Sequence, residues 1–280
     1  MILFFTLPPQ RVPWRWVLIN ANRPDKGFAY LYEHHRHVER IIIDSGIEIF
    51  RDPKLRDYPG GFHACLKRQV MLYERVKRLL PGADVMVTAC DYCDDYNPGS
   101  LWLSKDFTNI ERTVESVVTA VDWYPDVPWL IPVQGWYRRP DSLLISLEYY
   151  EELGILKRWR RLAVANLCVE VRGAIITRGV KYVHHWLVSH GYRDMWLHVF
   201  GLKIAALNRL RGILTSFDSV AWTRPLTAKL YKRGNWSAKS DGERELYFCV
   251  YIDRLRRKGV EIPVETLRWC RENTEYERYS

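Results

Sequence analysis

Short apolar segments alternate with longer amphipathic segments along most of this 280-residue chain. The short segments are rich in β-branched and aromatic residues, which favours strands, whereas the longer ones space their apolar residues as helices do. The expected strands are 15–19, 40–43, 85–88, 129–133, 162–166, 195–199 and 213–217. Strand followed by helix, repeated seven times or more, predicts a parallel sheet with crossover helices. We therefore expect an α/β fold of the TIM-type (β/α)8 barrel class.

The amphipathic segments between these strands predict the outer layer of helices. The expected helices are 30–39, 64–80, 108–123, 142–153, 174–190 and 203–210. In segment 64–80, Leu66 and Val70 belong to one apolar stripe, and Pro81 follows directly, as is typical of a helix exit.

A closed barrel of this class requires an eighth strand. Segment 3–7 is the candidate, and the alternative is that it only covers one end of the barrel. The chain contains no linker and no internal repeat, so we expect a single domain over residues 1–280. Its barrel core is predicted at about 14–235, with terminal helices within about 243–272.

Composition narrows the partners and the compartment. The chain carries 42 Lys and Arg against 33 Asp and Glu, a net charge of +9, which favours a polyanionic partner such as nucleic acid. Its apolar runs stop short of the ~20 residues that a bilayer requires, and the first residues lack the basic region of a signal peptide. Six cysteines are too few for a disulfide-built scaffold of this size. We expect a cytoplasmic protein with reduced cysteines and no membrane partner.

Polar side chains follow the ends of the expected strands. Asp44, Asp91, Gln134 and Asp218 each stand at such a position. In a barrel of parallel strands these ends converge on one rim, where active sites lie. Paired carboxylates suit glycosidic chemistry, because one attacks the anomeric carbon while another group protonates the leaving group. For each aspartate alone, the alternative is capping of the helix that follows.

Two of these segments resemble the catalytic segments of tRNA-guanine transglycosylases. The run SFDSVAWTR, residues 216–224, is similar to the family segment whose aspartate is the covalent nucleophile. Asp44-Ser45-Gly46 is similar to the segment whose aspartate is the general acid and base. The resemblance implies a pentosyltransferase in which Asp218 is the nucleophile and Asp44 transfers protons.

Four further segments, in the order of the family, are similar to its base-binding motifs. They include an Asp-X-Cys run at 91–93, a Val-Gln-Gly run at 133–135 and a stretch at 198–201 that places Phe200 for stacking. The base-binding residues implied are Asp91, Cys93, Gln134, Gly135, Leu167, Cys168, Phe200 and Gly201.

Departures from the family pattern point to its DNA-acting branch (DpdA type). Members that act on tRNA usually hold zinc with cysteines and a histidine after the nucleophile. Beyond Asp218 this chain has only Cys249 and Cys270 and no histidine, so we expect no zinc and no other cofactor. The Phe-Asp-Ser-X-Ala-Trp form around the nucleophile also resembles that branch. The resemblance implies exchange of guanine in DNA for a free 7-deazaguanine such as preQ0, through a glycosyl-aspartate intermediate, with accessory proteins as candidate partners.

Basic residues that follow Gln134 and Asp218 are the expected phosphate contacts, because they share the catalytic rim. They are Arg138, Arg139, Arg224, Lys229, Lys232 and Arg233. Three alternatives stay open: a tRNA substrate, a glycosidase or nucleosidase that uses the same carboxylates, and a binding module without activity. Cys90-X-X-Cys93 also allows a metal or redox reading, which we favour less because no second pair stands at zinc spacing.

Overall fold

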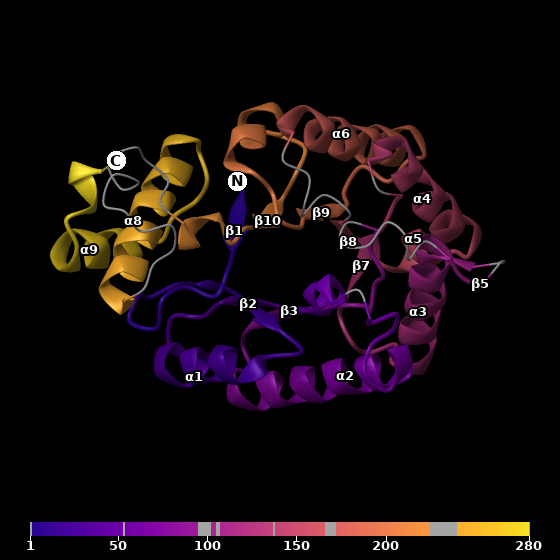
Figure 1. Cartoon of the computed structure of the whole chain (residues 1–280), viewed down its shortest axis with the longest axis horizontal. Coiled ribbons are helices and arrows are strands. Elements are labelled where there is room, and N and C mark those ends of the chain that lie inside the picture. Colours follow the sequence, from indigo (N-terminus) through magenta and orange to yellow (C-terminus); the bar gives the residue numbers. More distant parts are fainter. Residues whose placement is uncertain are drawn as a thin grey trace.

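The computed structural model describes residues 2–52, 54–94, 102–104, 107–136, 138–165, 172–224 and 240–279. Eight parallel strands form a nearly closed ring, shown in Figure 1. They are β1 (Leu3–Phe5), β2 (Trp16–Asn20), β3 (Arg40–Asp44), β4 (Asp84–Thr88), β7 (Trp129–Val133), β8 (Arg161–Val164), β9 (Trp196–Val199) and β10 (Ser216–Asp218). Neighbours in the ring follow chain order, and a parallel bridge between Thr6 and Val17 joins β1 to β2. The predicted TIM-type barrel is confirmed.

The eighth strand is β1, which comes first in the chain and pairs with β10. Its side chains alternate between the two faces of the barrel wall. The Phe4 ring packs 5.4 Å from that of Tyr251 on the outside, whereas the Phe5 ring lies 5.9 Å from that of His198 on the inside. The barrel therefore begins at Leu3 and not near residue 14 as predicted. A strand of three residues is too short to show a periodicity, which is why the sequence left it open.

Helices cover the outside of the ring, as Figure 1 shows. They are α1 (Pro24–His34), α2 (Gly61–Leu79), α3 (Asn109–Trp123), α4 (Leu143–Glu152), α5 (Ile155–Arg158) and α6 (Gly173–Ser189). One predicted boundary was wrong. The first helix begins at Pro24, a residue suited to the first helical turn, and not at residue 30. Between β9 and β10 the predicted helix 203–210 is present as a 3-10 helix, Ile204–Arg209.

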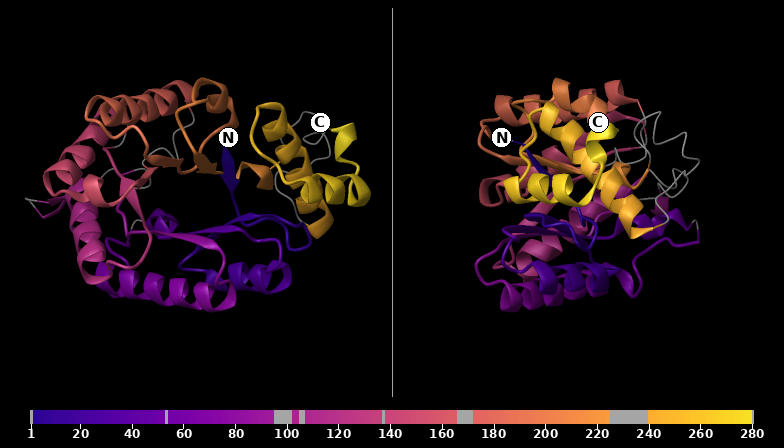
Figure 2. Two further views of the ribbon diagram at one scale, coloured as in Figure 1. Left: turned by 180° about the vertical axis from the view of Figure 1, so that it is seen from behind. Right: turned by 90° about the vertical axis from the view of Figure 1, so that its left-hand side faces the viewer.

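Two C-terminal helices, α8 (Asp241–Arg257) and α9 (Val264–Asn273), complete the outer layer beside β1. Figure 2 shows them together on one side of the barrel. No helix lies between β1 and β2, so the outer face of β1 needs another cover. Aromatic residues of α8 supply it: Tyr251 packs against Phe4 of β1, and beside it Phe248 packs edge to face against Trp14 and Trp222, with ring centroids 5.5 and 5.4 Å apart.

The helices of the described segments are all too short or too polar to span a bilayer.

A two-stranded sheet, β5 (Trp102–Ser104) and β6 (Phe107–Thr108), precedes α3. Helix α3 then begins with a capping box, in which Thr108 and Glu111 satisfy each other's backbone N–H groups.

Four of the six cysteines form two disulfides, which corrects the expectation of reduced cysteines. Cys65 of α2 pairs with Cys90 beyond β4, and Cys249 of α8 pairs with Cys270 of α9. The partners are 25 and 21 residues apart in the chain. Such pairs meet only when a helix packs against a neighbouring element, so the number of cysteines did not reveal them.

Candidate active site

The three predicted aspartates lie at the carboxyl ends of β3, β4 and β10. Asp44 is the last residue of β3, Asp218 is the last residue of β10, and Asp91 follows β4 by three residues. In the ring, β1 and β2 separate β3 from β10. The charges of Asp91 and Asp218 nevertheless both act on Asp44 and raise its pKa. Because the carboxyl ends of parallel strands lie at the same end of a barrel, the three carboxyl groups share that end.

Burial is the main cause that raises the pKa of Asp44 well above its ordinary value. The negative charges of Glu48, Asp91 and Asp218 raise it further, and a hydrogen bond from the backbone of Gly46 opposes them. This environment favours the protonated carboxyl group. Asp44 is thus suited to donate a proton.

Asp91 is buried and is held by two side chains. Ser45 Oγ donates to its Oδ1 at 2.6 Å, and Gln134 Nε2 donates to its Oδ2 at 2.5 Å. Its backbone carbonyl accepts from the Tyr58 hydroxyl at 2.8 Å. Burial raises the pKa of Asp91 to about 6, although both side-chain hydrogen bonds lower it. Gln134 Oε1 is also buried and has no hydrogen-bond partner among the residues that the structure describes. A carboxylate and an amide oxygen therefore remain available to accept N–H groups of a ligand.

We expect the contribution of Asp91 to the free energy of unfolding to fall as the pH rises. Its pKa is 3.8 in the unfolded chain and about 6 in the folded chain, so its stabilisation is complete below pH 3.8 and is lost as the pH passes 6. The loss amounts to about 3 kcal/mol. Urea denaturation of the unmodified protein and of Asp91→Asn between pH 4 and 7 measures it. As the pH rises, the unmodified protein should lose stability relative to Asp91→Asn. A stability difference that stays constant would contradict the raised pKa of Asp91.

Asp218 accepts one hydrogen bond from the end of β9 and lies beside a histidine of the same strand. The backbone N–H of Gly201 donates to Asp218 Oδ1 at 2.8 Å, and Nε2 of His198 lies 3.6 Å from the same oxygen. Gly201 has a φ of 62°, a conformation that glycine adopts without strain. The side chain of Asp218 is 17% exposed, whereas that of His198 is fully buried. Asp218 is therefore oriented from inside the barrel and accessible from its mouth.

The remaining base-binding predictions have different outcomes. Phe200 is buried and lies edge to face with His198, with ring centroids 4.7 Å apart, so it faces the barrel interior. Cys93 is buried beyond β4. Leu167 and Cys168 lie outside the described residues.

Gly135 has a packing role. A Cβ atom at this position would lie 2.8 Å from Ser142 Oγ and 3.1 Å from the backbone nitrogen of Leu143. Gly135→Ala is therefore expected to lower the free energy of unfolding by about 1–3 kcal/mol, the usual cost of overpacking. Gly82→Ala is the matched control, because a Cβ atom added there would have no atom within 4 Å of it. Chemical denaturation of both variants tests this, and equal stabilities would show that the β7–α4 turn yields without cost.

The predicted phosphate contacts are exposed where the structure describes them. Arg138 and Arg139 follow β7, and Arg224 follows β10, so all three lie in loops of the aspartate rim. Arg139 forms an ion pair with Asp141 at 2.9 Å, which offsets part of its charge. The other three predicted contacts, Lys229, Lys232 and Arg233, lie outside the described residues.

Sequence reasoning missed two residues of this site, Glu48 and His198. Glu48 lies in a short 3-10 helix, Ile47–Arg51, and its carboxylate accepts a hydrogen bond from Asn20 at the end of β2. Its charge raises the pKa of both Asp44 and Asp91. Its position in the sequence, four residues after Asp44 in the same strand-end loop, could have identified Glu48 as a member of the site.

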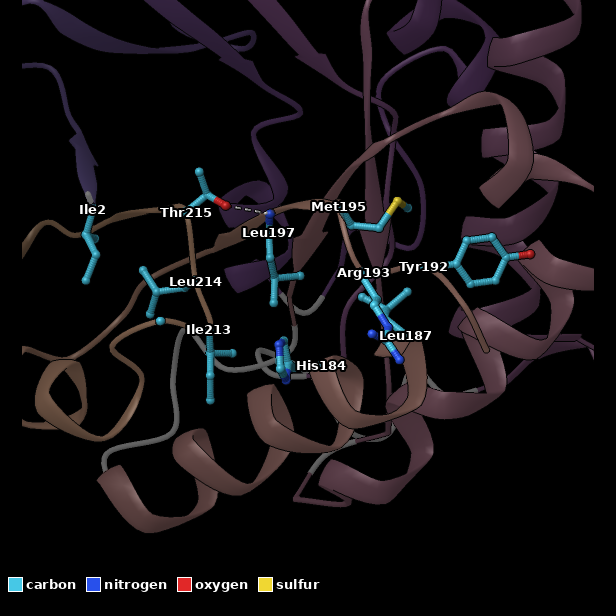
Figure 3. A pocket seen from close by; sticks show the side chains of 11 residues that line it. Ile2, His184, Leu187, Tyr192, Arg193, Met195, Leu197, Ile213, Leu214 and Thr215 are labelled. Atoms are coloured by element: carbon cyan, nitrogen blue, oxygen red, sulfur yellow. Dashed lines mark hydrogen bonds between the residues drawn. The ribbon is translucent and has the colours of Figure 1, made fainter. Parts of the chain in front are cut away.

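A cavity of about 300 Å³ lies at the opposite end of the barrel. Figure 3 shows it beside Leu197 and Thr215, where the backbone N–H of Leu197 donates to Thr215 Oγ1 at 3.2 Å. These residues stand at the beginnings of β9 and β10, and the lining contains no carboxylate. This cavity is separate from the aspartate rim.

Within the described ranges, no three His, Cys, Asp or Glu side chains are grouped as a metal ion requires. Cys90 is bonded to Cys65, so while that disulfide is formed the Cys90-X-X-Cys93 segment has no pair of free thiols for metal or redox chemistry.

No protein-family model matches the chain, and no match was found among curated proteins. The function is therefore inferred from the residues and their geometry.

Proposed function

We propose that the protein is a nucleic-acid guanine transglycosylase that exchanges guanine in DNA for a free 7-deazaguanine base. One observation carries this proposal: two partly buried carboxyl groups at one rim have different neighbours. Desolvation and like charges favour the acid form of Asp44, whereas the Gly201 N–H donates to the carboxylate of Asp218 and the His198 ring lies beside it. Such a pair supplies a proton donor and a nucleophile for one glycosidic bond.

The exchange proceeds in two displacements at C1′. A carboxylate oxygen of Asp218 attacks C1′, the bond from C1′ to N9 breaks, and Asp44 gives its proton to the departing guanine. The product of this step is a glycosyl ester on Asp218. The ring nitrogen of the incoming base then attacks C1′, its proton passes to the Asp44 carboxylate, and the ester bond to Asp218 breaks.

Acceptor groups on the same rim as Asp218 support guanine-like bases as the exchanged groups. Guanine and 7-deazaguanines present a ring N–H and an amino group on one edge. The Asp91 carboxylate and Gln134 Oε1 are acceptors placed to receive such donors. The target base must leave its stack first, at a cost of a few kcal/mol in duplex DNA.

The charge of the chain favours a nucleic acid over a small neutral sugar. The net charge is +9, and Arg138 and Arg224 are exposed on the rim loops. Phosphate contacts of this kind weaken as salt concentration rises, because binding releases counterions. Substrate binding that is insensitive to salt would favour the glycosidase or nucleosidase alternative.

Incubation with labelled preQ0 and either duplex DNA or tRNA, followed by nucleoside analysis, tests the proposal. Label in DNA nucleosides is the expected result. Label in tRNA alone would assign the substrate to tRNA and keep the chemistry. If neither acquires label, and a nucleoside or glycoside is hydrolysed instead, the transglycosylase proposal is overturned.

A further inference from the structure

His198 is a fully buried histidine directly below the proposed nucleophile. Its Nε2 atom lies 3.6 Å from Asp218 Oδ1 and has no hydrogen-bond partner among the described residues. Its Nδ1 atom lies 2.9 Å from Ser216 Oγ. The register of the sheet creates this arrangement, because Ser216 of β10 is paired with His198 of β9, and Asp218 lies two residues beyond Ser216 on the same face.

The hydrogen bonds around Ser216 select the form of the imidazole. The indole Nε1–H of Trp196 can only donate, and it donates to Ser216 Oγ at 3.0 Å. Among the described residues, Nδ1 of His198 is the acceptor within reach of the serine hydroxyl proton, so we assign that proton to the Ser216–His198 hydrogen bond. In the neutral ring the remaining proton is on Nε2, where it points toward the carboxylate of Asp218. The opposite tautomer would place a nitrogen lone pair against a carboxylate oxygen, which is repulsive.

We propose that His198 is a positioning residue that orients Asp218 for attack and stabilises its carboxylate when the glycosyl ester breaks. This inference rests on the proposed role of Asp218 as the nucleophile. The contacts described for Asp218 with Gly201 and His198 both fall on Oδ1. Oδ2 is therefore the oxygen that we assign to the bond with C1′, and Oδ1 becomes the carbonyl oxygen of the ester. In the second displacement negative charge returns to this carboxylate, and the Nε2–H group of His198 stabilises it.

Loss of the N–H donor should impair Asp218 more as a leaving group than as a nucleophile. In His198→Phe we expect turnover to fall by about 10- to 100-fold, because the returning carboxylate charge loses a nitrogen donor that can close on it in the reaction. The KM for the free base should change less than turnover, because the acceptors assigned to the base, Asp91 and Gln134, are unchanged in this variant. The fraction of protein trapped as the covalent adduct should rise, which a general loss of structure would not produce.

Two further variants separate positioning from packing. His198→Gln retains an N–H donor at a similar distance from the backbone and should recover much of the turnover. Ser216→Ala removes the hydroxyl that directs the proton of His198 and should give a smaller defect of the same kind. If His198→Phe does not fold, these two variants decide the question. Normal turnover and a normal adduct fraction in Ser216→Ala, together with no recovery in His198→Gln, would overturn the inference.

The test uses purified full-length protein, duplex DNA and labelled preQ0, with adduct measured on denaturing gels and turnover by nucleoside analysis. Absence of adduct and exchange in the unmodified protein would reject the proposed function itself. Normal exchange in the unmodified protein together with unchanged kinetics in a folded His198→Phe would reject only the role of His198.

Discussion

Asp218→Ala is expected to abolish the covalent adduct between protein and nucleic acid and to lower turnover by roughly 10⁴-fold or more. The variant lacks the oxygen that forms the bond to C1′, so no glycosyl ester is possible. Its fold should persist, because the Asp218 side chain is partly exposed and lies at the end of a strand. Adduct on denaturing gels, turnover, and DNA affinity by a binding assay together measure the effect.

Two controls make this result specific. Asp218→Asn keeps the shape of the side chain and an oxygen for the N–H of Gly201, and it should also form no adduct. Asp194→Ala removes an exposed aspartate just before β9, at the opposite end of the barrel, and should leave adduct and turnover unchanged. Adduct that survives in Asp218→Ala would remove this residue from the role of nucleophile.

Asp44→Asn is expected to slow base exchange by about 10²- to 10⁴-fold, the usual contribution of a general acid and base. Asparagine has nearly the same shape but cannot deliver a proton, so binding of DNA and of the free base should weaken much less. In the unmodified protein the rate should fall at high pH, as Asp44 loses the proton that its raised pKa retains. Asp44→Asn should lack that decline. Kinetics over a range of pH measure both effects, and unchanged turnover in the variant would reject proton transfer by Asp44.

Glu48→Gln provides a matched test of the electrostatics. The Glu48 charge raises the pKa of Asp44, so its removal should shift the alkaline decline in rate to lower pH. The proton donor itself stays in place, and the maximal rate should change less than in Asp44→Asn. A pH profile identical to that of the unmodified protein would show that this charge does not govern Asp44.

The barrel was predictable because its signal is local. Each run of β-branched residues, each amphipathic stretch and each polar residue at a strand end can be recognised within about ten residues. Asp44, Asp91 and Asp218 were placed on one rim for that reason alone. The local signal was weak in three places: β1, which the sequence offered only as a candidate strand, the start of α1 at Pro24, and the segment between β9 and β10, which is a 3-10 helix.

The contacts that distinguish this site were not predictable, because each joins residues distant in the chain. The hydrogen bond of Gln134 to Asp91 spans 43 residues, that of Gly201 to Asp218 spans 17, and the Cys65–Cys90 bond spans 25. The sequence placed His198 in a base-binding stretch but gave it no role of its own, and only the pairing of β9 with β10 puts its ring beside Asp218. Local pattern thus specified the strands and the polar rim of this protein. The protonation of Asp44 and the orientation of Asp218 depend on closure of the ring, because charge and burial act through space and not along the chain.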